Sequence, residues 1–145
     1  MDTDKKKDEE GFFGVLFDPG SASSFGELNV ITEQIIRASF TVSNTLGCGF
    51  LEKVYENALS IELRKAGLLV KQQEPIKVFY SGEEVGFYQA DLVVDDRVLV
   101  ELKSVREMND VHRAQCINYL KATGLRICLL INFGNPKVEV KRIAL

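Results

Sequence analysis

The residues of this chain whose types and spacing could do chemistry lie between positions 91 and 103. Asp91, Glu101 and Lys103 stand in a segment that is otherwise typical of two short apolar strands. If residues 95–97 form the loop of a β-hairpin, Asp91 lies opposite Glu101, and the alternation of side chains along a strand puts Lys103 on the same face. A two-residue loop would move Asp91 to the apolar face, which is an unfavourable register. In the favoured register the apolar face consists of Leu92, Val94, Val98 and Val100.

Two carboxylates held close together on a half-buried sheet repel each other and need a shared proton or a cation. Magnesium is typically held by one or two carboxylates together with phosphate oxygens. Lys103 could orient a water molecule or offset charge at a phosphorus centre. The triplet therefore fits metal-assisted hydrolysis of a phosphodiester. Taken alone, Glu-x-Lys is more often a surface ion pair on a strand.

Further polar residues fall at helical spacing. Glu52 and Tyr55 lie three residues apart, and Gln115 and Tyr119 lie four apart, so each pair is expected to share a helix face. These four side chains could border one site. The two tyrosines could instead be half-buried packing residues with solvated hydroxyls. His112 is interpreted as a surface residue at the start of a helix.

The elements that must position these residues follow from apolar periodicity. Residues 28–45 and 51–66 are predicted helices, and residues 111–123 form a third, capped by Asn109 or Asp110 and stopped by Gly124. The apolar face expected for the second helix consists of Val54, Ala58, Ile61 and Leu63. Strands are predicted at 69–73, 76–80, 85–88, 91–94, 98–103, 126–133 and 138–143, with Pro75 separating the first two and 138–143 at an edge. This order predicts an α/β fold in residues 27–145, and residues 1–26 are expected to be a flexible tail.

Length and charge exclude several classes of protein. The chain has 145 residues and a formal charge of -3, which suits one domain. Residues 1–28 hold seven acidic and three basic residues, and residues 29–145 hold 14 acidic and 15 basic ones. A nucleic-acid-binding surface must therefore be local. No stretch approaches the ~20 apolar residues of a membrane span, and the N-terminus lacks the order of a secretory signal, so no membrane partner is expected.

Cysteine and histidine usage predicts a reducing compartment. Three widely spaced cysteines do not form a disulfide framework or a zinc knuckle, and one histidine excludes a histidine-rich metal site. We therefore expect a cytoplasmic protein in which Cys116 and Cys128 are small core residues.

Taken together, the polar residues are recognisable as an ordered set. They are Gly49-x-x-Glu52-x-x-Tyr55, Asp91, Glu101-x-Lys103, Gln115-x-x-x-Tyr119 and the Leu-Ile-Asn-Phe-Gly of residues 130–134. The set resembles the GxxExxY protein family, which is placed in the PD-(D/E)XK nuclease superfamily near its RecB-like branch. The resemblance covers residues 28–145. Ala90 stands where the superfamily name has proline, and Cys48 where a proline is expected.

The resemblance implies a restriction-endonuclease-like core, a mixed β-sheet flanked by helices. It implies that Asp91 and Glu101 are metal ligands, that Lys103 is the catalytic lysine, and that Glu52 completes or supports the metal site. Gln115 and Tyr119 would orient the site and contact substrate, and Tyr55 belongs to the same motif.

The leading hypothesis is a nuclease that depends on Mg²⁺ or Mn²⁺ and acts on DNA rather than RNA. The alternative is a nuclease-fold module with weak or no catalysis, which acts by binding nucleic acid or protein; near-neutral charge favours it. A homodimer formed through the apolar segment 12–17 is a further possibility.

Overall fold

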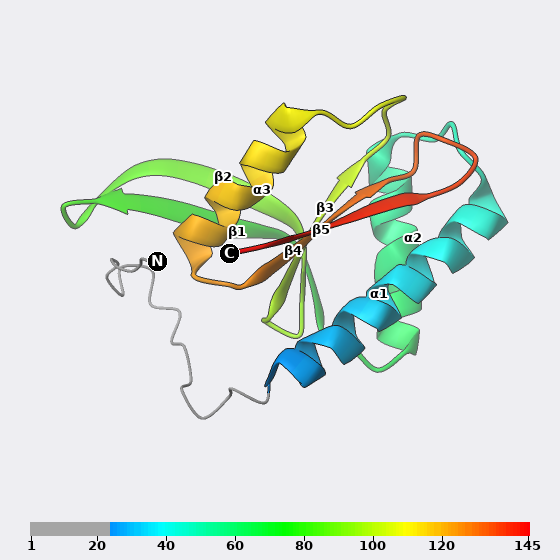
Figure 1. Cartoon of the computed structure of the whole chain (residues 1–145), viewed down its shortest axis with the longest axis horizontal. Coiled ribbons are helices and arrows are strands. Elements are labelled where there is room, and N and C mark those ends of the chain that lie inside the picture. Colours follow the sequence, from blue (N-terminus) through cyan, green and yellow to red (C-terminus); the bar gives the residue numbers. More distant parts are fainter. Residues whose placement is uncertain (1–23) are drawn as a thin grey trace.

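The computed structural model describes residues 24–145, so the predicted tail and its apolar segment lie outside the described residues. Three helices and five strands follow one another along the chain (Figure 1). They are α1 (Ser24–Leu46), α2 (Glu52–Lys65), β1 (Val70–Tyr80), β2 (Glu83–Val94), β3 (Val98–Lys103), α3 (Asp110–Thr123), β4 (Ile127–Asn132) and β5 (Glu139–Ala144). The predicted α/β fold is confirmed.

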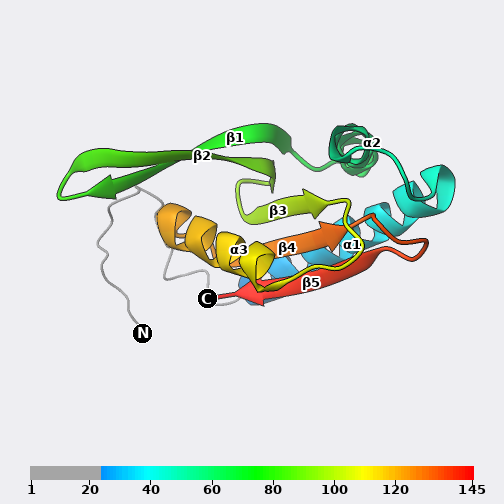
Figure 2. The same ribbon diagram turned by 90° about the horizontal axis from the view of Figure 1, so that it is seen from above.

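One mixed sheet forms the centre of the molecule, with strand order β1-β2-β3-β4-β5. Only β3 and β4 are parallel, and α3 connects them. Helices α1 and α2 pack on one face of the sheet and α3 packs on the other. The β1–β2 ribbon extends beyond the other strands (Figure 2).

The predicted β2–β3 hairpin has the register favoured by the apolar pattern. Val94 pairs with Val98 and Leu92 with Val100, around a loop of residues 95–97. All four valine and leucine side chains are buried against α1 and α2. Asp95 takes a positive φ of 53° in this loop and its carboxylate accepts a hydrogen bond from the amide of Leu69 at 2.9 Å.

The structure corrects the prediction for β1 and β2. Pro75 does not separate two strands, since β1 runs through it and Pro75 pairs with Gln89. Because β1 is an edge strand of the sheet, a residue without an N–H group is tolerated there. The strands expected at 85–88 and 91–94 are likewise one continuous strand, β2.

The predicted apolar face of α2 is confirmed at Leu63 and at Ala58, which packs against the core, but is wrong at Val54 and Ile61. Val54 and Ile61 are 39% and 55% exposed, whereas Tyr55, Leu59 and Leu63 are fully buried. The helix is thus rotated relative to the apolar pattern. The rotation brings two polar residues, Glu56 and Ser60, into buried positions as well.

Helix α3 begins and ends as expected. The side chain of Asn109 accepts hydrogen bonds from the amides of Val111 and His112, and Gly124 takes a left-handed conformation at the C-cap. His112 Nδ1 accepts a hydrogen bond from the amide of Asn109 at 3.3 Å, which completes a capping box. The interpretation of His112 as a helix-start residue is confirmed.

Cys116 on α3 and Cys128 on β4 are buried and not linked by a disulfide, as expected for core residues. None of the helices between residues 24 and 145 is long and apolar enough to cross a membrane.

Candidate active site

Asp91 and Glu101 lie together at the point where β2 and β3 separate. The backbone amide of Asp91 donates to Glu101 Oε2 at 2.9 Å, and the amide of Leu102 donates to Asp91 Oδ2 at 2.7 Å. The cross-strand pairs of this hairpin end at Leu92 and Val100, one residue before the two acids. The two carboxylates therefore accept backbone amide protons at the point where the cross-strand ladder ends.

Burial and mutual repulsion disfavour the charged forms of both acids. Glu101 is only 3% exposed, and its burial, together with the nearby charge of Asp91, raises its pKa to about 8. Burial also raises the pKa of Asp91, and the charges of Glu56 and Glu52 add to that effect. At neutral pH the pair thus needs a proton or a cation.

The donor set fits a hard divalent cation. Within the described residues, Oε1 of the buried Glu101 has no hydrogen-bond partner, and Asp91 Oδ1 accepts only a long hydrogen bond of 3.3 Å from Gln73. A buried carboxylate oxygen without a partner is costly unless a ligand occupies it. Oxygen ligands of this kind suit Mg²⁺ or Mn²⁺. In residues 24–145, however, no group of three or more His, Cys, Asp or Glu side chains is gathered closely enough to hold a metal ion.

Lys103 lies two residues beyond Glu101 on β3, half-buried, and pairs in register with Asn132 of β4. The alternation of side chains along β3 puts Lys103 and Glu101 on the same face of the strand, and the positive charge of Lys103 lowers the pKa of Glu101 against the larger effect of burial. Within the described part of the chain its ammonium makes no hydrogen bond or ion pair within 4 Å. Such a cation is available to a substrate.

Glu52 and Glu56 occupy different environments on α2. Glu52 is exposed at the first position of the helix, and its charge acts on Asp91 more weakly than that of Glu56. Glu56, one turn later, is 4% exposed. Sequence reasoning missed Glu56; its spacing of four residues from Glu52 was the available signal.

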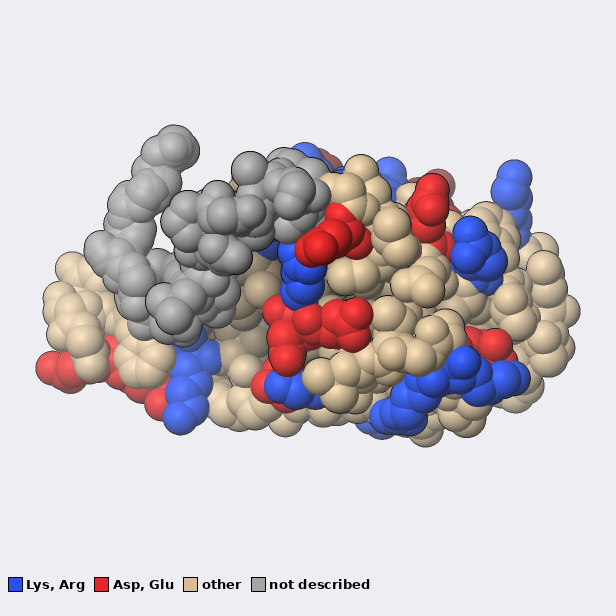
Figure 3. Space-filling view, turned by 90° about the horizontal axis from the view of Figure 1, so that it is seen from below, with Lys and Arg blue, Asp and Glu red and all other residues tan. Residues whose placement is uncertain are grey.

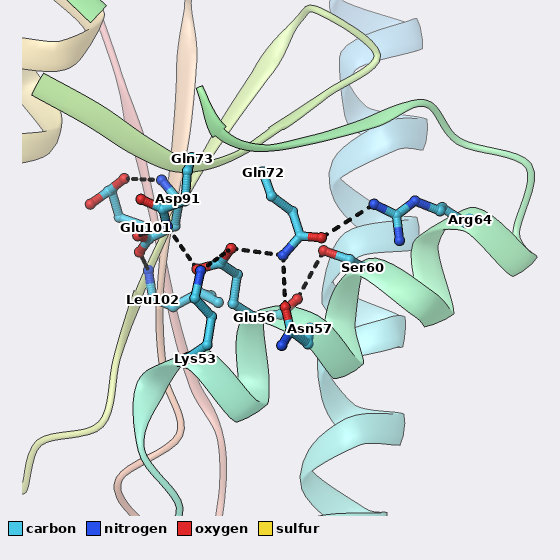
Figure 4. A network of polar contacts seen from close by, with 10 residues as sticks. All are labelled: Lys53, Glu56, Asn57, Ser60, Arg64, Gln72, Gln73, Asp91, Glu101 and Leu102. Carbon is cyan, nitrogen blue, oxygen red and sulfur yellow. Dashed lines mark hydrogen bonds and ion pairs between the residues drawn. The ribbon is translucent and has the colours of Figure 1, made fainter. Parts of the chain in front are cut away.

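Two glutamines of β1 hold Glu56 in place. Gln72 Nε2 donates to Glu56 Oε2 and Gln73 Nε2 donates to Glu56 Oε1, each at 2.8 Å. Gln73 Nε2 also donates to Asp91 Oδ1, so one amide bridges the two acids (Figure 4). Lys53 adds an ion pair to Glu56 at 3.2 Å. This network links α2 to the carboxylate pair.

Gln73 has a positive φ of 53°, a conformation that non-glycine residues rarely adopt. On its N-terminal side Val70 packs against α1 and α2, and on its C-terminal side Ile76 packs against α3. The unusual backbone thus coincides with a change of face along β1. The same change aims the Gln73 amide at the site.

Helix α3 borders the site from the other side. Tyr119 is 5% exposed, and Gln115 Nε2 donates to its hydroxyl at 3.0 Å. Burial, followed by the nearby charge of Glu101, raises the pKa of Tyr119 to about 12, so its phenol stays protonated. The ring of Tyr88 on β2 lies 5.6 Å from that of Tyr119. The structure therefore brings Gln115 and Tyr119 to the carboxylate pair.

Tyr55 does not point toward that pair. It is fully buried, and its ring stacks on Phe133 with centroids 4.5 Å apart. Its hydroxyl donates to the carbonyl of Gly47 at 2.6 Å and accepts from the amide of Phe50 at 3.2 Å. Tyr55 thus fixes the connection between α1 and α2, at which Glu52 begins its helix.

The end of β4 fixes the connection after Lys103. Asn132 is fully buried; its Nδ2 donates to the carbonyl of Val105 and its Oδ1 accepts from the amides of Val105 and Gly134. A Cβ at Gly134 would come within 2.1 Å of the Val105 carbonyl oxygen. The Asn-Phe-Gly of residues 132–134 is thus a structural brace for the residues beside the site.

Basic side chains do not form one continuous surface on the face that Figure 3 shows. Lys and Arg gather in separate groups there, interrupted by Asp and Glu. This agrees with the near-neutral charge of residues 29–145. On this face, any contact with an anionic partner is local.

A mixed sheet flanked by helices that presents an aspartate opposite Glu-x-Lys defines a restriction-endonuclease-like class of protein. A family model described as the PD-(D/E)XK nuclease superfamily matches residues 29–143. The chain therefore belongs to that superfamily, whose members typically use divalent metal ions.

Two solved structures match this chain in the comparison of structures. The crystal structure of SSO0001 is 16% identical over 87% of this chain and 62% of its own, with a TM-score of 0.48. An alkaline exonuclease from Laribacter hongkongensis, LHK-Exo, is 15% identical over 92% of this chain and 74% of its own, with a TM-score of 0.48. This chain thus spans less than two thirds of the length of the first structure. No curated protein matches.

Proposed function

We propose that this protein is a nuclease that hydrolyses phosphodiester bonds in DNA and depends on Mg²⁺ or Mn²⁺. The observation that carries the proposal is the carboxylate pair. Asp91 and Glu101 are fixed by backbone amides, a buried oxygen of Glu101 lacks a partner within the described residues, and the ammonium of Lys103 lies nearby. A buried acid pair with an open oxygen and an adjacent free cation favours binding of a dication and a phosphate.

Each residue of the candidate site has a distinct role in this proposal. Asp91 and Glu101 hold the ion, which when bound activates water and offsets charge at phosphorus. Lys103 binds and orients a phosphate oxygen or the attacking water. Glu56 and Glu52 supply further negative charge from α2, and Gln73 positions Asp91 relative to Glu56.

The finer assignment to the GxxExxY family and the RecB-like branch is part of the same proposal. It is supported by Glu52, Gln115 and Tyr119, which lie around the carboxylate pair from α2 and α3. Under this assignment Gln115 and Tyr119 contact the substrate or orient the site. Tyr55 supports it by holding the chain that leads to Glu52.

Cleavage of labelled single-stranded, double-stranded and branched DNA tests the proposal, with Mg²⁺ or Mn²⁺ added to metal-free protein. We expect cleavage that Lys103→Ala and Glu101→Gln abolish and that Lys121→Ala, an exposed change on α3, leaves intact. If no substrate is cleaved with either ion, or if Lys103→Ala cleaves as well as the unchanged protein, the proposal is wrong.

A second candidate, a nuclease-fold module that binds without useful turnover, has one observation in its favour. No three-ligand group exists among residues 24–145, and both carboxylate oxygens of Glu56 accept hydrogen bonds from glutamines. Salt-dependent binding of DNA without cleavage would support this candidate.

A further inference from the structure

A pocket of about 450 Å³ is lined by Glu52 and by the segment that follows Lys103, and neither the superfamily match nor the proposed roles assign it a ligand. Residues 49–52, 104–106 and 134–135 line it. The first segment ends at Glu52, whose charge acts on Asp91, and the second follows Lys103 directly. The pocket therefore lies next to the position that the scissile phosphate would occupy. Its volume falls within the range of small-molecule sites, roughly 300–1,000 Å³.

Hydrogen bonds between the lining segments fix the shape of the pocket. The carbonyl of Phe50 accepts a hydrogen bond from Ser104 Oγ at 3.0 Å, and its amide donates to the hydroxyl of Tyr55. Asn135 Nδ2 donates to the carbonyl of Arg106 at 3.0 Å. These bonds join the three lining segments, so the pocket exists before a ligand arrives.

Two exposed side chains line the pocket. The ring of Phe50 is 46% exposed, and it contacts the ring of Tyr55 in an edge arrangement with centroids 6.1 Å apart. The guanidinium of Arg106 makes no hydrogen bond or ion pair to another side chain within the described residues, and Glu52 across the pocket does not reach it. An exposed aromatic ring beside a free cation is a combination that binds a base and its phosphate.

We propose that this pocket binds the unpaired nucleotide next to the scissile phosphate, with its base stacked on Phe50 and its further phosphate on Arg106. This rests on the proposed function, and it names the substrate class as single-stranded nucleic acid. In a duplex the base is stacked and paired within the helix and is not free to enter a side pocket. A single strand offers a free base beside each phosphate.

Binding of a fluorescent 12-nucleotide single strand, followed by anisotropy over a series of salt concentrations, tests the pocket. All variants carry Glu101→Gln so that the strand stays intact. We expect Phe50→Ala and Phe50→Leu each to weaken binding by roughly tenfold or more, since leucine keeps the apolar volume but not the aromatic face. We expect Arg106→Ala to weaken binding and to reduce the slope of log K against log salt by about 0.7, the loss of one phosphate contact.

Two exposed residues on other elements supply matched controls. Phe87 on β2 is 53% exposed and Arg37 lies on α1; Phe87→Ala and Arg37→Ala should leave affinity and salt slope unchanged. If Phe87→Ala weakens binding and Phe50→Ala does not, the base stacks on the β1–β2 ribbon and the pocket assignment is wrong. If no oligonucleotide binds, or if a duplex of the same sequence binds more tightly than the single strand, the pocket assignment is also wrong.

The outcome is separable from that of the proposed function. Binding that depends on Phe50 and Arg106 in a protein that cleaves nothing with Mn²⁺ would keep the pocket and reject the nuclease. Cleavage that requires Lys103, with binding indifferent to Phe50 and Arg106, would keep the nuclease and reject the pocket.

Discussion

Asp91 and Glu101 are positioned by each other's strands: the amide of Asp91 binds the Glu101 carboxylate, and the amide that follows Glu101 binds the Asp91 carboxylate. Two carboxyl groups are thereby fixed side by side before any cation is present. Holding them there costs folding free energy, because the burial of Glu101 and the partial burial of Asp91 raise the pKa of both carboxyl groups. Such a pair is organised for a ligand rather than for stability.

The stability of the metal-free protein should fall as pH rises from about 4.5 to about 8. Unfolded Glu101 releases its proton near 4.5, whereas the folded protein retains it up to about 8. Between these values the folded state binds more protons than the unfolded state, so the free energy of unfolding decreases with pH. Urea denaturation in the presence of a chelator, at about pH 5 and about pH 8.5, measures this.

Glu101→Gln serves as the control for that experiment, because its amide oxygen still accepts the Asp91 amide proton but carries no charge. We expect the variant to lose most of the decrease between the two pH values. We also expect Mn²⁺ to stabilise the unchanged protein more at the higher pH, and calorimetry to detect no Mn²⁺ binding by the variant. Equal pH dependence in both proteins would contradict this account of the pair.

Replacing Gln73 should separate its backbone role from its side-chain role. Gln73→Gly relieves a positive φ, worth about 1 kcal/mol, but removes the amide that bridges Glu56 and Asp91. Ser81→Gly relieves a φ of 52° in the β1–β2 turn, far along the ribbon. We expect Mn²⁺ affinity, measured by calorimetry, to fall for Gln73→Gly alone. A Gln73→Gly protein with unchanged affinity would show that the bridge is dispensable.

Tyr55→Phe should reduce stability and leave chemistry intact. The phenylalanine keeps the ring that stacks on Phe133 and loses hydrogen bonds to Gly47 and Phe50. We expect a loss of about 1–2 kcal/mol in the free energy of unfolding and cleavage per folded molecule within twofold of the unchanged protein, roughly the scatter of such assays. A stable variant that has lost cleavage would instead assign the phenol to the reaction.

Gly134→Ala should destabilise the protein by about 1–3 kcal/mol, since the added Cβ meets the Val105 backbone, which cannot move aside cheaply. Gly26→Ala is the matched control: nothing lies within 4 Å of its Cβ position on α1, and alanine favours a helix. We expect the control to be neutral or stabilising by less than about 1 kcal/mol. Equal thermal melting of the two variants would refute the assigned clash.

The hairpin that carries the acids could be predicted from the sequence because one register alone buries four apolar side chains and keeps Asp91 off that face. Such a choice depends on neighbours in sequence and on the two-residue period of a strand. The α/β class and the caps of α3 depend on local chemistry in the same way. The hairpin register, the α/β class and the caps of α3 could therefore be predicted from the sequence.

Only part of the buried face of α2, Leu63 and Ala58, could be predicted, because tertiary partners decide the rest. Val54 and Ile61 satisfy the apolar period, yet the helix buries Glu56, whose partners Gln72 and Gln73 come from β1. A glutamate is expected in solvent until such partners are known. Sequence reasoning consequently named Glu52 on this helix and missed the acid that acts more strongly on Asp91.

The brace formed by residues 132–134 has a consequence for mutational screens scored by activity alone. Asn132 accepts hydrogen bonds from the amides of Val105 and Gly134 and so fixes the chain that follows Lys103. Phe133 stacks on Tyr55, which fixes the connection that leads to Glu52. None of these contacts involves the carboxylate pair. Replacement of Asn132 or Gly134 would lower the measured activity by reducing the amount of folded protein, as replacement of a metal ligand would lower it by removing the chemistry. Only a parallel readout of protein abundance or melting would tell the scaffold of this site from its reactive groups.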